Sequence, residues 1–96
     1  MHAAPTRYLV EIRRQLVLRD VQTIGDRSRR AAGELRSEGT AVRFLRTIVV
    51  PEDDACYLLF EAGSARDVEE AVRRSSSGPA VVTEVLSAEL EGEGRL

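Results

Sequence analysis

The spacing of hydrophobic residues changes period several times along the 96 residues, and the order of these changes limits the folds available to the chain. Residues 7–13 alternate in character, with Tyr8, Val10 and Ile12 on one face, which indicates a strand. Residues 20–38 repeat apolar side chains every three or four positions, which indicates an amphipathic helix. Further strands are predicted over 41–50, 55–61 and 80–90, and a second helix over about 65–74.

Local signals indicate where these elements begin and end. Asp20 is placed to cap the first helix, and Gly39 suits a left-handed exit from it. Ser64 opens a capping box for the second helix. Residues 51–54, Pro-Glu-Asp-Asp, predict a turn between two strands. We expect the tail, residues 91–96, to be flexible.

The resulting order, βαββαβ, predicts an α+β fold of the ferredoxin-like type. In this sandwich a four-stranded antiparallel sheet carries two helices on one face. Right-handed crossovers place the first and third strands in the centre of the sheet. The length predicts a single domain over residues 1–96, with an ordered core over about 6–90.

The second strand is apolar on both of its faces, since Phe44 and Ile48 alternate with Leu45 and Val49. The third and fourth strands share this property. Helices would cover one face only, and an uncovered apolar sheet of this size exceeds the patch that soluble monomers normally expose. We therefore expect a homodimer through the open sheet face, a dimeric α+β barrel with room for a small-molecule ligand. The alternative is a monomer with scattered surface aliphatic side chains.

Composition excludes several classes of function. A net charge of −2 gives no electrostatic footprint for nucleic acid, and no apolar run approaches the roughly 18–20 residues of a membrane span. The only cysteine, Cys56, and the only histidine, His2, leave no cysteine-based zinc site and no histidine cluster. We expect no metal and no cofactor. Without a signal segment or a disulfide, the expected location is the cytoplasm.

Three short stretches point to a known family: Arg7-Tyr-Leu-Val-Glu11, Phe60-Glu-Ala62 and Val82-Thr-Glu-Val85. With them the chain resembles the small bacterial nickel-binding-protein-like family of ferredoxin-like dimeric α+β barrels, most of whose members have no known function. Residues 42–85 follow the family pattern without a gap, whereas the first helix and both termini match poorly. The resemblance implies a βαββαβ dimer, with metal binding in some members.

The departures from that family concern its metal ligands. Where its second strand often reads Trp-Val-His-Ser-Tyr, this chain reads Phe44-Leu-Arg-Thr-Ile48, which puts Arg46 at the histidine position. The family's cysteine falls at Leu58, two positions after Cys56. Arginine has no lone pair to give a metal, and nickel prefers imidazole and other nitrogen donors. No metal ligand is therefore carried over.

A polar group on the open face is the predicted ligand site. If Val10, Ile12 and Val85 face the helices, Glu11 and Glu84 lie together on the other face of neighbouring strands. The candidate ligand-binding residues are Glu11, Phe44, Arg46, Ile48 and Glu84. A desolvated carboxylate there would have a raised pKa and could transfer protons. The alternative interpretation is a salt-bridge network that orients the dimer.

These residues favour a small homodimeric binding or accessory protein of unknown ligand. A first alternative is a cofactor-free enzyme of the dimeric α+β-barrel type, such as a monooxygenase, isomerase or cyclase. It would use Glu11 or Glu84 as base and Arg46 to hold an anionic oxygen. The lack of tryptophan, asparagine and a usable histidine speaks against it, and no catalytic residue is assigned. A second alternative, a metal-binding protein, follows from the family alone.

Overall fold

Two βαβ units follow each other in the computed structural model, which describes residues 5–13 and 15–85. The elements are β1 (Thr6–Ile12), α1 (Leu18–Ser37), β2 (Val42–Val50), a 3-10 turn η1 (Pro51–Asp53), β3 (Ala55–Ala62), α2 (Ala65–Ser75) and β4 (Ala80–Val85). The predicted order of strands and helices is confirmed. Residues 86–90 of the predicted last strand and the predicted flexible tail lie outside the described residues.

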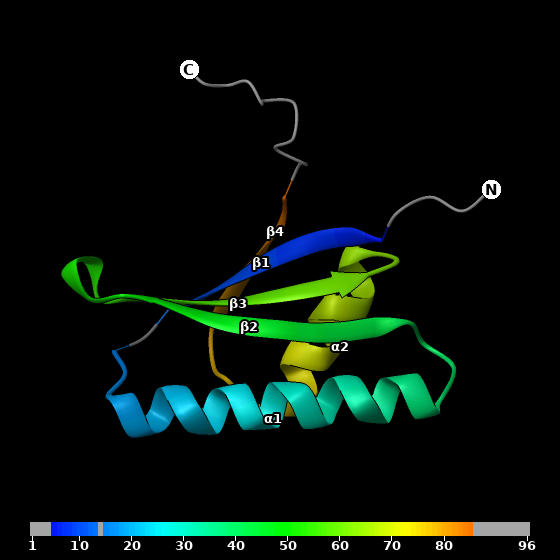
Figure 1. The fold of residues 1–96 in the computed structure, drawn as a ribbon, viewed down its shortest axis with the longest axis horizontal. Helices are drawn as coiled ribbons and strands as arrows, with labels where there is room; N and C mark the ends of the chain where they lie inside the picture. The colour runs from blue at the N-terminus through cyan, green and yellow to red at the C-terminus, as the bar shows by residue number, and fades with distance from the viewer. Residues whose placement is uncertain (1–4, 14, 86–96) are drawn as a thin grey trace, which may run out of the picture.

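The four strands form one antiparallel sheet in the order β2-β3-β1-β4, with β1 and β3 in the centre. This is the ferredoxin-like arrangement that the sequence predicts. Helix α1 packs against β2 and α2, while α2 packs against β3 and β4. Figure 1 shows α2 behind the sheet and α1 running alongside β2, so neither helix of the described residues covers the opposite sheet face.

The core lies between the sheet and the two helices. Alternate residues of β1 and β3 enter it because successive side chains of a strand point to opposite faces. The rings of Phe44 and Phe60 meet edge to face with centroids 5.4 Å apart. The largest fully buried apolar side chains are Phe60, Ile24, Leu58, Val10, Val42 and Val68.

Small residues on the buried face of α1 let this helix approach the sheet closely. That face contains Gly25, Ser28, Ala31 and Ala32. A Cβ atom at Gly25 would lie 3.1 Å from Oγ1 of Thr47, a residue of β2, which is tighter than ordinary van der Waals contact. The absence of a side chain at Gly25 therefore sets the separation between α1 and β2 at this point.

The helix ends follow the predictions in part. Helix α1 begins directly after Val17, and Asp20 lies in its first turn, where a carboxylate oxygen accepts a hydrogen bond from the Val17 N–H at 3.4 Å. The prediction that Asp20 itself precedes and caps the helix is therefore wrong. Gly39 has the predicted left-handed conformation, with φ +96°. Ser64 caps α2 as predicted, because its Oγ accepts the Asp67 N–H at 3.3 Å.

One arginine joins the two helices. The Arg74 guanidinium of α2 contacts Glu70 at 2.8 Å on its own helix, Glu38 at 2.9 Å just beyond α1, and Glu34 at 3.6 Å within α1. Hydrogen bonds from Arg73 and then Arg74 lower the pKa of Glu70 to about 2. The hydrogen bond from Arg74 also lowers the pKa of Glu38. These carboxylates therefore favour the folded state while they are ionised.

Candidate functional site

The candidate functional site is the sheet face opposite α1 and α2, which no helix of residues 5–13 and 15–85 covers. The strand register arranges the side chains of this face in rows. Each row crosses the sheet from β2 through β3 and β1 to β4. The three rows are Arg43, Glu61, Arg7 and Val85; Arg46, Leu59, Leu9 and Thr83; and Ile48, Tyr57, Glu11 and Val81. We call this surface the open face.

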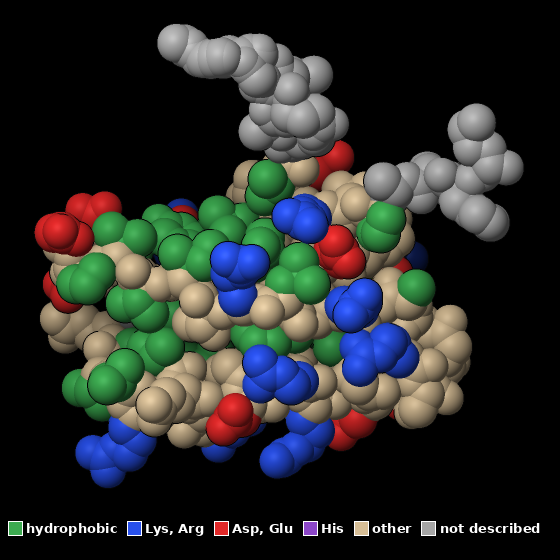
Figure 2. Space-filling view, in the orientation of Figure 1, with side chains coloured by type: hydrophobic (Ala, Val, Ile, Leu, Met, Phe, Trp, Pro, Cys, Tyr) green, Lys and Arg blue, Asp and Glu red, His purple; other side chains and the backbone are tan. Residues whose placement is uncertain are grey.

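Apolar side chains gather in the second and third rows of the open face. Leu9, Tyr57, Leu59 and Ile48 are half-buried, and Val81 is 41% exposed. Figure 2 looks onto this face and shows hydrophobic side chains together over the part of the strands that leads to η1, with arginines toward the other end. The result is an apolar surface that spans all four strands of a single copy.

Two ion pairs lie on the open face. Arg7 contacts Glu61 on the neighbouring strand at 3.3 Å, with side chains 57% and 18% exposed. Glu11 of β1 contacts Arg13, the residue directly after that strand, at 3.4 Å, and the Glu11 side chain is 41% exposed. Such exposed pairs contribute little to stability, about 0–1 kcal/mol. The Glu11 carboxylate therefore remains available to a further cationic partner.

Two arginines of β2 add positive charge beside the apolar rows. Arg43 and Arg46 are exposed, and neither makes an ion pair with any other residue of 5–13 and 15–85. Arg46 is a predicted site residue, whereas Arg43 is not among the predicted residues. Strict alternation from Arg46 would place Arg43 on the helix side, and the two arginines share the open face only because the register shifts between Phe44 and Arg46.

A β-bulge in β2 changes which residues face the helices. The register runs from Phe44 opposite Phe60 to Arg46 opposite Leu59, which leaves Leu45 as an extra residue. A bulge of this kind places two residues of one strand against a single residue of its partner. Phe44 consequently lies on the helix face, whereas Arg46 lies on the open face.

Because of the bulge, Phe44 lies on the other face of the sheet from the one that the sequence predicts. Phe44 was expected beside Arg46 and Ile48, but its ring packs on the helix side, where the Arg29 guanidinium lies 5.1 Å from its centroid. A cation at this distance from a ring is attracted by its negative face. Arg46 and Ile48 share the open face as expected, and Ile48 lies in one row with Glu11.

Glu84 is also not where the sequence places it. Its partner on β1 is Tyr8, so Glu84 lies on the helix side, whereas Val85 pairs with Arg7 and lies on the open face. The expectation that Glu11 and Glu84 share one face is therefore wrong, and no pair of carboxylates forms there. Valines occupy both faces of β4, so its alternation could not fix the register.

Comparisons of the chain with family models, with curated proteins and with solved structures gave no match. Within residues 5–13 and 15–85, no three His, Cys, Asp or Glu side chains lie close enough together to hold a metal ion. No helix in this part of the chain is long and apolar enough to cross a membrane.

Proposed function

We propose that the protein is a small homodimeric binding or accessory protein in which the open faces of two copies cover each other and hold a small ligand between them. The apolar rows of the open face carry this proposal. Soluble monomers rarely expose contiguous apolar patches above a few hundred Å². A two-fold axis would cover the face of each copy with the same face of the other.

Charge on the open face supports this pairing of two copies. In one copy β3 separates Arg46 from Glu11, so their strands are two spacings, about 9–10 Å, apart. Across a two-fold axis, Arg46 of one copy can approach Glu11 of the other. This contact would give Arg46 an acidic partner, add a second basic partner to Glu11 beside Arg13, and fix the orientation of the two sheets.

The enclosed ligand would meet mostly aliphatic walls, with Arg46 on the edge strand β2 and Glu11 on the central strand β1. This chemistry suits a small molecule with an apolar body and one anionic group. Among the residues proposed as a base in the enzyme alternative, only Glu11 would reach such a ligand, because Glu84 lies on the helix side. Nothing in the geometry favours that alternative over binding.

We also propose that the chain is a divergent relative of the nickel-binding-protein-like family that has lost its metal site. The βαββαβ order and the central positions of β1 and β3 support a shared fold. Arg46 at the family's histidine position supports the loss, since a guanidinium cannot ligate a metal. Nickel bound at one ion per subunit in isothermal titration calorimetry would contradict this proposal.

Native mass spectrometry of protein purified without chelator or added metal tests the dimer and the ligand together. We expect the mass of two subunits, with an additional organic mass where the ligand is retained. Leu59→Glu, at the centre of the open face, should give monomers, whereas Val17→Glu, on the exposed start of α1, should leave the dimer intact. A monomer of the unaltered protein would refute the proposal.

A charge exchange tests the predicted contact itself. Arg46→Glu and Glu11→Arg should each weaken the dimer, because each brings like charges together across the two-fold axis. The double variant restores opposite charges and should regain most of the affinity. Analytical ultracentrifugation measures all three. A double variant that is weaker than both single variants would show that the two side chains do not meet.

A further inference from the structure

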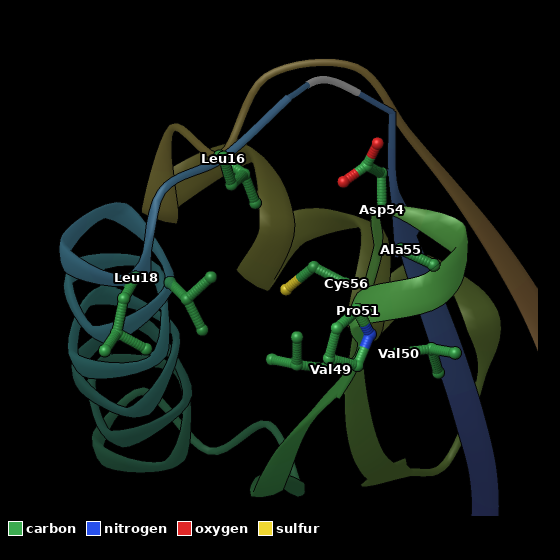
Figure 3. A pocket seen from close by; sticks show the side chains of 9 residues that line it. Leu16, Leu18, Val49, Val50, Pro51, Asp54, Ala55 and Cys56 are labelled. Atoms are coloured by element: carbon green, nitrogen blue, oxygen red, sulfur yellow. The ribbon is translucent and has the colours of Figure 1, made fainter.

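A second apolar surface lies on the helix side, at the end of the molecule where α1 begins and β2 runs into β3. A pocket of about 230 Å³ opens there, and we call it the end pocket. Its walls include Leu16, Leu18, Val49, Asp54 and Cys56 (Figure 3). Val49 and Cys56 are neighbours in the β2–β3 register, and the first turn of α1 leaves Val49 46% exposed.

The rim of the end pocket exposes large aliphatic side chains. Leu18 is 72% exposed, the largest value among the exposed large hydrophobic residues of the described chain, and Val49 also belongs to this group. In Figure 3 the Cys56 sulfur points into the space between the strands and α1. Burial raises the pKa of the Cys56 thiol, so the floor of the pocket is uncharged at neutral pH. Exposed apolar surface around a concave site is typical of an interaction site.

Three consecutive acidic residues lie at one side of the end pocket, in the turn between β2 and β3. Glu52, Asp53 and Asp54 are all exposed, and none forms an ion pair with another residue in the described part of the chain. Asp54 itself lines the pocket. The negative potential of three neighbouring carboxylates attracts cations and repels the phosphates of nucleic acids and of anionic lipids.

We propose that the end pocket docks a segment of a partner protein that inserts one large aliphatic or aromatic side chain and carries arginine or lysine beside it. A volume of about 230 Å³ is below the roughly 300–1,000 Å³ of sites for drug-sized molecules and suits one side chain. Interfaces commonly rely on such a buried anchor, and the acidic rim supplies the preference for basic flanks. The open face lies on the other side of the sheet, so docking here does not depend on the proposed dimer.

Titration of the ¹⁵N-labelled full chain with three short peptides, followed by NMR, tests the chemistry of the occupant. The probe is acetyl-Arg-Phe-Arg-amide, and its controls are acetyl-Glu-Phe-Glu-amide and acetyl-Arg-Gly-Arg-amide. We expect saturable shifts of the Val21, Val49 and Cys56 amides with the first peptide, and at least about tenfold weaker binding of both controls. Equal binding of the acidic and basic phenylalanine peptides, shifts centred on the open face, or no saturable shift would each overturn the proposal.

A matched pair of variants tests the location. Leu18 lines the end pocket, whereas Val17, 58% exposed, is its neighbour in the chain but does not line it. Glutamine forms helices well and adds no charge, so Leu18→Gln and Val17→Gln should both fold without changing the acidic rim. We expect Leu18→Gln to weaken binding of acetyl-Arg-Phe-Arg-amide at least about tenfold and Val17→Gln to change it less than about twofold. Equal effects of the two substitutions would overturn the proposal.

A third variant tests the acidic rim. Asp54 has a left-handed backbone with φ 49°, which asparagine also adopts readily. Asp54→Asn therefore removes one charge without straining the turn. We expect about threefold weaker binding of the basic peptide and a smaller dependence of binding on salt. An unchanged affinity with an unchanged salt dependence would show that the rim does not select the partner.

Discussion

Two glycines of α1 allow a direct test of how closely this helix packs on β2. Alanine in place of glycine stabilises a helix by about 0.4–1 kcal/mol, mainly because the unfolded chain loses conformational freedom. At Gly33 the added methyl group would lie 3.7 Å from Nη2 of Arg36, an ordinary contact. Gly33→Ala should therefore raise the free energy of unfolding by about 0.5–1 kcal/mol.

The same substitution at Gly25 should have the opposite sign. The new Cβ would lie 3.1 Å from Thr47 Oγ1 in the buried interface between helix and sheet. Thr47 is β-branched and has few rotamers to move into, so the helix or the strand must shift. Overpacking of this kind costs about 1–3 kcal/mol, more than the gain in helix propensity. We expect Gly25→Ala to lower the free energy of unfolding by about 0.5–2 kcal/mol.

Urea unfolding followed by far-UV circular dichroism measures both effects. All variants should be compared at one protein concentration, because dimerisation would add a concentration-dependent contribution to stability. Thr47→Ala removes Oγ1, and in that background Gly25→Ala should no longer destabilise the protein. If Gly25→Ala stabilises the unaltered chain as much as Gly33→Ala does, the close approach of α1 to β2 is refuted.

Three further predictions concern the core, the helix contacts and the cysteine. Phe60→Ala should cost roughly 3–5 kcal/mol in chemical unfolding because Phe60 is fully buried, and a loss below about 1 kcal/mol would contradict its place in the core. The pKa of Glu70 lies at about 2 instead of 4.5, so the stability that its ion pairs provide is complete above pH 4.5 and is lost as the pH falls toward about 2. Arg74→Gln should flatten this part of the pH profile of thermal unfolding, and an unchanged profile would refute the role of Arg74. Cys56, 4% exposed and with a raised pKa, should react with iodoacetamide at neutral pH far more slowly than in urea-unfolded protein, and similar rates would contradict its burial.

The order of elements and the central strands could be predicted from the sequence because the relevant patterns are unambiguous. Tyr8, Val10 and Ile12 form one uninterrupted apolar face of β1, and all three are buried. Gly39 and Ser64 act through local backbone chemistry that does not depend on distant residues. Predictions of this kind succeed where one face or one turn has a single favourable arrangement.

The prediction of the site failed in part because it depended on which alternate residues of β2 and β4 face the helices. Leu45 is an extra residue in a bulge, and the alternation of faces along β2 is reversed beyond it. Phe44 and Arg46 therefore lie on opposite sides of the sheet. In β4, valines on both faces allow two registers, and the actual register puts Glu84 on the helix side. Nothing local in the sequence distinguishes these arrangements, since pairing with β3 and β1 decides them.

The bulge also determines where β2 can change in length. Leu45 has no pairing partner in β3, and the pairs on either side of it are Phe44 with Phe60 and Arg46 with Leu59. Loss of Leu45 would join these pairs into a regular ladder and leave every other side chain of the strand on its present face. A single deletion elsewhere in the strand would turn over all the residues between that deletion and the bulge. Deletions of one residue in the lineage of this chain are therefore expected to be accepted at Leu45 and rejected elsewhere in the strand.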